Sequence, residues 1–252
     1  MPVRDHHLNN CILIRFWLMW YWFKYSRNIV NSVTVKTGSP APDLKVSEWV
    51  QGGPISLKDY LGKVVVVEVF QVNCPGCFVY GIPEAIDTYN KYKNNKVAVL
   101  GLATAFEDFD KNTIENLKLL LNEKKVIGET LTTLTYQSKL LNEGKISYSI
   151  PFPVGMDMLV KEKLPIEEKR IMEFINANML DFDLYHEKDK EQIISRVKSY
   201  LETKPYSPLT FEEYSLRGTP STIFIDKNGD LSETTFGSTG IMATTVEKLL
   251  SE

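Results

Sequence analysis

Two of the three cysteines in the chain stand close together, in the run Cys74-Pro-Gly-Cys77. Such a pair can ligate zinc, form a structural disulfide or exchange disulfides. A zinc site needs about four ligands, but no second pair of this kind exists and His186 stands alone in a charged stretch. We therefore predict no metal site and favour redox chemistry, with an inert disulfide as the lesser alternative.

The sequence around the pair predicts a strand followed by a helix. Residues 63–72 read KVVVVEVFQV, a β-branched run typical of a central strand that is buried on both faces. Residues 78–93 then predict a helix that contains Pro83. Free N–H groups and a partial positive charge at a helix start favour thiolate over thiol, so the pKa of Cys74 should be lowered. The helix also brings Cys77 back to within disulfide reach of Cys74.

Other segments complete an α/β pattern around this unit. The run VAVLGLA at 97–103 predicts a second strand, which gives a strand–helix–strand unit. STIFID at 221–226 predicts a third strand, and Asn228-Gly229 predicts a turn into an antiparallel return. Further elements are expected as an extended stretch at 38–44, a polar turn at 51–54, a helical turn at 56–62 capped by Ser56, helices at 112–124, 129–141, 165–178, 187–203 and 244–250, and strands at 152–156 and 231–236.

Four segments resemble the thioredoxin-like superfamily, and within it the redoxin branch. This branch holds TlpA-type thiol–disulfide oxidoreductases and the alkyl hydroperoxide reductase/thiol-specific antioxidant proteins. The matching pieces are GSPAPDL at 38–44, LGKVVV at 61–66, CPGC at 74–77 and RGTPSTIFID at 217–226. The resemblance implies a three-layer α/β fold, in which helices flank a central mixed sheet. It places residues 35–252 in one redoxin domain, with a helical insertion at about 159–213 before the strand that follows the cis-proline.

The resemblance also implies roles for individual residues. Cys74 would be the exposed nucleophile and Cys77 the buried resolving thiol. Pro220 matches the family's cis-proline beside the disulfide, and cis peptide bonds are essentially confined to proline. Gly218 and Thr219 would then offer backbone groups to an extended substrate. An ordinary turn before a strand is the alternative for this segment.

Glu68 interrupts the apolar strand six residues before Cys74. Thioredoxins carry a buried acid at this offset. Burial should raise the pKa of such a carboxyl group, which could then accept the proton of Cys77 directly or through water. The alternative is a glutamate that faces an edge or pairs with a cation.

The sequence departs from the family pattern at several positions. Asn73 replaces an aromatic residue that many members carry before the first cysteine, and Pro83 falls six rather than five residues after Cys77, so the helix kink should be displaced. Peroxiredoxins carry a threonine and a proline where this chain has Gln71 and Val67. These differences weaken a peroxidase assignment, for which Arg217 and Gln71 are the remaining candidate peroxide contacts.

The predicted function is therefore thiol–disulfide exchange with protein or small-molecule disulfides. Electrons would come from an external thiol or reductase. No bound organic cofactor is expected, because the chain carries neither a GxGxxG fingerprint nor a P-loop. A thiol-dependent peroxidase and a non-enzymatic binding module are the alternatives.

The N-terminal 34 residues differ from the rest of the chain. Residues 12–23 read ILIRFWLMWYWF, which is shorter than a membrane span and is interrupted by Arg15. This segment predicts either an interfacial membrane anchor or a tail outside the working domain, which also holds His6, His7 and Cys11. We expect a cytoplasmic protein, with membrane anchoring as the alternative. The net charge of −3 argues against a nucleic-acid partner.

Overall fold

The computed structural model describes residues 35–92, 96–137, 141–179, 181–237 and 240–252. The aromatic segment at 12–23 lies outside these ranges, so both of its interpretations stay predictions. Within the described ranges, no helix combines the length and apolarity that crossing a membrane would require.

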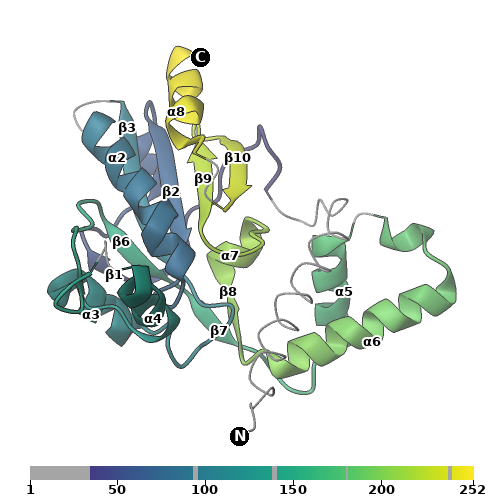
Figure 1. Cartoon of the computed structure of the whole chain (residues 1–252). Coiled ribbons are helices and arrows are strands. Elements are labelled where there is room, and N and C mark those ends of the chain that lie inside the picture. The colour runs from purple at the N-terminus through teal and green to yellow at the C-terminus, as the bar shows by residue number, and fades with distance from the viewer. Residues whose placement is uncertain (1–34, 93–95, 138–140, 180, 238–239) are drawn as a thin grey trace, which may run out of the picture.

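A six-stranded mixed sheet forms the centre of the fold (Figure 1). Its strand order is β1-β6-β3-β2-β9-β10. β3 is parallel to both β2 and β6, whereas β1, β9 and β10 run antiparallel to their neighbours. The strands span Val46–Gln51 (β1), Val64–Phe70 (β2), Val97–Ala103 (β3), Val154–Asp157 (β6), Ser221–Ile225 (β9) and Leu231–Phe236 (β10). The predicted α/β fold with a central mixed sheet is confirmed.

Every residue of β2 is buried, as its run of valines predicts. Alternate residues belong to two apolar clusters, because successive side chains of a strand point to opposite faces. The first cluster packs under α2 (Ile82–Tyr92), α3 (Ile114–Glu123), α4 (Gly128–Gln137) and α8 (Met242–Ser251). The second is covered by the short helices η2 (Leu57–Tyr60) and α7 (Leu209–Glu213). The result is a three-layer arrangement in which β2 is the most protected strand.

The edge strand β1 was not predicted, because its sequence VSEWVQ has no regular apolar pattern. It lies at the edge of the sheet and pairs only with β6, and none of its residues is fully buried. The capped turn at Ser56 is present, with Ser56 accepting from Lys58 N–H at 3.3 Å. The helix predicted at 129–141 ends at Gln137, ahead of residues that the structure does not describe.

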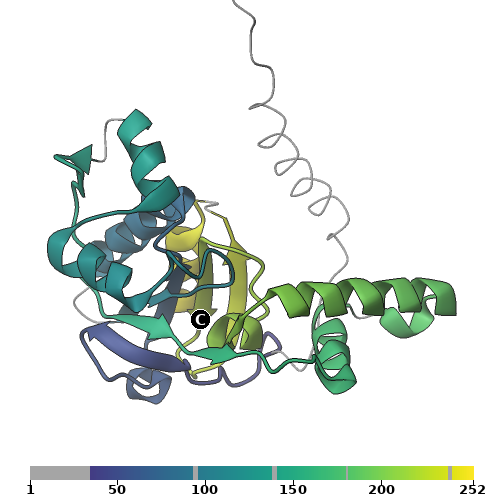
Figure 2. The ribbon, with the colours of Figure 1, turned by 90° about the horizontal axis from the view of Figure 1, so that it is seen from below.

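Residues 159–208, called the lobe below, lie between β6 and α7. Strands β7 (Leu159–Lys161) and β8 (Tyr206–Pro208) pair antiparallel at its base. Helices α5 (Glu168–Asn178) and α6 (Glu187–Thr203) extend to one side of the sheet (Figures 1 and 2). They share a small apolar cluster of their own, made of Ile166, Ile171, Ile175, Phe182 and Leu201. The remaining short elements are β4 (Leu141–Asn142), β5 (Lys145–Ile146), η3 (Cys77–Gly81) and η4 (Phe182–Leu184).

Candidate active site

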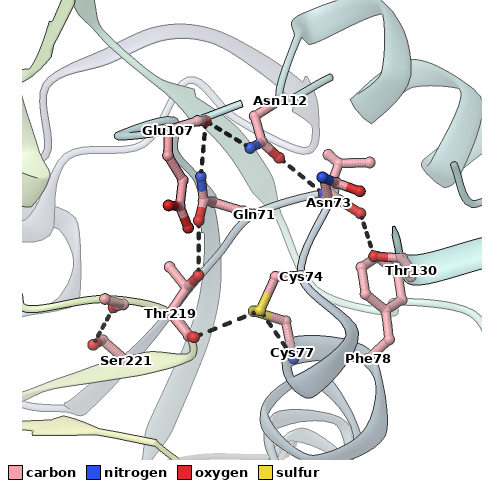
Figure 3. Close-up of a disulfide and its surroundings, with 12 residues drawn as sticks. Gln71, Asn73, Cys74, Cys77, Phe78, Glu107, Asn112, Thr130, Thr219 and Ser221 are labelled. Carbon is pink, nitrogen blue, oxygen red and sulfur yellow. Dashed lines mark hydrogen bonds between the residues drawn. A yellow bond between two sulfur atoms is a disulfide. The ribbon is translucent and has the colours of Figure 1, made fainter. Parts of the chain in front are cut away.

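Cys74 and Cys77 form a disulfide at the start of the helix that follows β2 (Figure 3). Their Cα atoms are 5.4 Å apart, within the usual range for a disulfide. Cys74 is partly exposed and Cys77 is fully buried. The Cys77 N–H group donates to Cys74 Sγ at 3.2 Å. A backbone donor so placed stabilises negative charge on that sulfur, and therefore favours a Cys74 thiolate after reduction.

The helix opens with a π turn over Cys77–Gly81. The Ile82 N–H group donates to Cys77 O, five residues back. A π turn inserts one residue into a helix, and this accounts for Pro83 standing one residue later than the family pattern. In this hydrogen-bonding pattern Phe78 O would need the N–H group that Pro83 lacks. The Tyr148 hydroxyl donates to Phe78 O instead, at 2.7 Å.

The segment Gly218-Thr219-Pro220 lies beside the disulfide, directly before β9 (Figure 3). The Thr219–Pro220 peptide bond is cis. Thr219 O lies 3.5 Å from Cys74 Sγ. Gly218 and Pro220 are buried, whereas Thr219 is partly exposed. The structure thus brings the cis-proline segment to the exposed sulfur, although 145 residues separate Thr219 from Cys74 in the chain.

Glu68 is 1% exposed in the middle of β2, between β3 and β9. The alternative of an edge-facing glutamate is therefore wrong, and no ion pair with Glu68 occurs among the described residues. Its partner across the sheet is Thr222, whose hydroxyl donates to Glu68 Oε2 at 3.0 Å. Within the described part of the chain, Oε1 is buried without a hydrogen-bond partner.

The environment of Glu68 favours its neutral form. Burial raises the pKa of Glu68 well above the usual range, the Thr222 hydrogen bond opposes this, and the Glu84 charge adds to it. A Cβ atom placed on Gly81 would collide with Oε1 of Glu68 and lie 2.7 Å from Pro220 Cβ. The unpaired oxygen therefore faces the helix that carries Cys77, next to the cis-proline.

The sequence offers Gln71 as a candidate peroxide contact in the place of a peroxidase threonine. It is 2% exposed. Its amide oxygen accepts from the Thr219 hydroxyl at 3.1 Å, and its amide nitrogen donates to Glu107 O at 3.3 Å. Both ends of the amide are therefore engaged within the protein, and Arg217 is exposed.

Asn73 was noted only as a missing aromatic residue, yet it joins three segments. Its backbone N–H group donates to Asn112 Oδ1 at 2.8 Å, and its side-chain nitrogen donates to Asp108 Oδ2 at 2.8 Å. Its side-chain oxygen accepts from Glu129 N–H at 2.7 Å, in the first turn of α4. A polar residue where the family has an aromatic one was the only sequence signal for these contacts.

Metal binding finds no support in the described ranges, where no three or more His, Cys, Asp or Glu side chains gather. The disulfide at a strand-to-helix junction, the adjacent cis-proline and the mixed sheet together define a thioredoxin-like redox protein.

Comparison with known proteins agrees with this class. Residues 37–158 match the model of the AhpC/TSA family. The crystal structure of a thioredoxin-like superfamily protein aligns with a TM-score of 0.53 at 29% identity, over 85% of this chain and 98% of that one. A thiol-disulfide isomerase from Corynebacterium glutamicum gives a TM-score of 0.54 at 28% identity, with the same coverage of 85% and 98%.

Two curated relatives match over less than a third of this chain. Protein FixW of Rhizobium leguminosarum is 36% identical over 77 residues, which are 29% of this chain and 33% of FixW. Protein DipZ of Mycobacterium tuberculosis is 36% identical over 75 residues, which are 28% of this chain and 11% of DipZ. The chain thus spans about a third of FixW and about a tenth of DipZ. The solved structures and the site place this chain in the thioredoxin-like superfamily, and its similarity to the AhpC/TSA family lies within residues 37–158.

Proposed function

We propose that this protein exchanges disulfides with proteins or small molecules through Cys74 and Cys77. The observation that carries the proposal is the position of Cys74: the residue is partly exposed, and its Sγ lies 3.2 Å from the Cys77 backbone nitrogen and 3.5 Å from Thr219 O. One group stabilises a thiolate, and the other belongs to a backbone segment that a substrate strand can pair with.

In the first step the reduced protein attacks the substrate. The Cys74 thiolate attacks one sulfur of the substrate disulfide, forms a mixed disulfide, and releases the other substrate sulfur as a thiolate. The backbone of Thr219, a partly exposed residue, holds the substrate chain beside Cys74 during this step. Gly218 and Pro220 set the direction of the backbone on either side of it.

In the second step Cys77 resolves the mixed disulfide. Glu68 takes the Cys77 proton through its unpaired oxygen, directly or through a water molecule, and the Cys77 thiolate attacks Cys74 Sγ. The Cys74–Cys77 disulfide forms while the second substrate sulfur leaves and takes up a proton. Two electrons pass from the dithiol to the substrate, and an external thiol or reductase restores the dithiol.

The proposal also covers the domain around the two cysteines and the role of Gln71. Residues 35–252 form one redoxin domain that works without a bound cofactor, and residues 159–213 are an insertion in it. The amide oxygen of Gln71 and one of its two amide N–H groups are already bonded within the protein, which supports disulfide exchange over peroxide reduction.

The test uses the full chain as a Cys11→Ser, Cys77→Ser variant, so that Cys74 is the only thiol. We expect the reduced variant to form a stable mixed disulfide with a disulfide-bearing peptide, visible as a mass increase on Cys74. A variant that also carries Cys74→Ser is the control and should gain no mass. Failure to form the adduct would overturn the proposal, and a peroxide reaction far faster than that of free cysteine would point to a peroxidase.

A further inference from the structure

The backbone carbonyl group of Glu107 accepts hydrogen bonds from two side-chain amides near the redox centre, those of Gln71 and Asn112 (Figure 3). Gln71 Nε2 donates to it at 3.3 Å, and Asn112 Nδ2 donates to it at 2.9 Å. Both donors are almost completely buried, at 2% and 1% exposed. Glu107 itself lies in the bend after the end of β3, the strand next to β2.

The opposite ends of the two amides hold the two backbones that flank Cys74. Gln71 Oε1 accepts from the hydroxyl of Thr219, whose own carbonyl faces Cys74 Sγ. Asn112 Oδ1 accepts from the backbone N–H group of Asn73, the residue before Cys74. One amide therefore fixes the cis-proline segment, and the other fixes the redox loop.

We propose that Gln71 and Asn112 are positioning residues that set the gap between Cys74 and the cis-proline segment, each through the Glu107 carbonyl. The inference rests on the proposed function, because that gap is where the substrate strand enters. Amide side chains suit this task because each holds a donor and an acceptor in one rigid plane. Loss of either end leaves a buried polar group without its partner.

We call the contacts Glu107–Gln71–Thr219 the Gln71 arm and the contacts Glu107–Asn112–Asn73 the Asn112 arm. Loss of each arm should cause a different defect. The Gln71 arm positions the substrate-binding edge, so its loss should raise KM for a peptide disulfide and leave the intrinsic reactivity of Cys74 unchanged. The Asn112 arm positions the loop that carries Cys74, so its loss should move the pH midpoint for alkylation of the reduced Cys74 thiol. A role in stability alone would predict neither separation.

The experiment compares six variants of the full chain in the Cys11→Ser background, one of which combines Gln71→Leu with Thr219→Val. Gln71→Leu and Thr219→Val break the first arm from opposite ends, Thr219→Ser restores the hydroxyl, and Asn112→Leu breaks the second arm. Thr245→Val is the matched control, because it removes a threonine-to-glutamate hydrogen bond of 3.1 Å between α8 and β10. Each variant is assayed for KM and kcat with a peptide disulfide, and for iodoacetamide alkylation of Cys74 against pH.

We expect Gln71→Leu and Thr219→Val each to raise KM about fivefold, as one neutral hydrogen bond is worth. The double variant should be no worse than either single one, Thr219→Ser should behave as the parent, and Asn112→Leu should shift the alkylation midpoint. The inference is overturned if the first-arm variants match Thr245→Val in KM, or if Asn112→Leu leaves the midpoint unchanged. Absence of exchange by the parent protein would instead contradict the proposed function, while the alkylation midpoint would still test the Asn112 arm.

Discussion

The redox site and the base of the lobe both hold buried or half-buried ionisable side chains, but these side chains have different partners. In the lobe, Arg170 donates to Glu162 at 2.8 Å and to Glu212 at 3.0 Å, and Lys204 also donates to Glu212 at 2.8 Å. In the redox site, Glu68 accepts a single hydrogen bond from Thr222, and its other oxygen has no partner among the described residues.

The pKa values of Glu162 and Glu68 are consequently shifted in opposite directions. Burial opposes ionisation of Glu162, but hydrogen bonds from Arg170 and Ser207 outweigh it and lower the pKa of Glu162. For Glu68 burial dominates and the pKa is raised. A paired carboxylate stays charged and holds elements together, whereas burial without a cationic partner raises the pKa of a carboxyl group and favours its neutral form. This difference supports a structural role for the lobe cluster and is one reason to propose proton transfer at Glu68.

Glu68→Gln should give the largest effect. We expect the rate at which Cys77 resolves a mixed disulfide to fall about 100-fold near neutral pH, since a positioned proton acceptor contributes at least that much. The wild-type rate should rise with pH as Glu68 ionises through its raised pKa, and the variant should lack this rise. Single-turnover measurements over a pH series would decide, and identical profiles would remove Glu68 from the mechanism.

The same variant tests the burial of Glu68 through stability. Its folded pKa lies above the ordinary value of 4.5, so the neutral form is favoured in the folded state. The resulting stabilisation is complete below pH 4.5 and is lost as pH rises through the folded pKa. Denaturant unfolding of the oxidised protein should therefore show a decline in this window for the wild type that Glu68→Gln lacks.

Gly81→Ala should give the next largest effect. The added Cβ atom would collide with Glu68 Oε1 and lie 2.7 Å from Pro220 Cβ, so we expect a loss of about 2 kcal/mol in the free energy of unfolding. Gly76→Ala is the matched control on the same helix, because its Cβ atom would have only one neighbour, Pro220 Cδ at 3.8 Å. Equal unfolding midpoints for the two variants would contradict the close approach of Glu68 to the π turn.

Arg170→Met should give the smallest of these effects and confine it to stability. Removing the shared cation leaves Glu162 and Glu212 partly unpaired, at a cost of about 1 to 2 kcal/mol for a site that keeps some solvent exposure. Disulfide exchange should be unchanged. Lys169→Met is the control, because the Lys169–Glu173 pair is largely exposed and 3.8 Å apart. A loss of exchange in Arg170→Met would show that the lobe contributes to the chemistry.

Local sequence patterns predicted the central elements well. Strands β3 and β10 and helix α6 have the predicted ends, and β2 and β9 differ by one or two residues, because apolar runs, turn residues and helical periodicity mark them clearly. The pairs β4–β5 and β7–β8 were missed because two or three residues carry no detectable period. Their strand character comes from pairing across the fold.

Some features of the site could likewise be predicted from local sequence, whereas others depend on the tertiary structure. The sequence by itself determined that Cys74 and Cys77 stand at the start of a helix after a buried strand, because spacing and periodicity are local properties. Only the tertiary structure decided that Gln71 meets Thr219, 148 residues away, and that Asn73 meets Asn112 and Glu129, 39 and 56 residues away. An amide side chain has no preferred partner until folding brings donors and acceptors together in a buried space, where leaving them unpaired is costly.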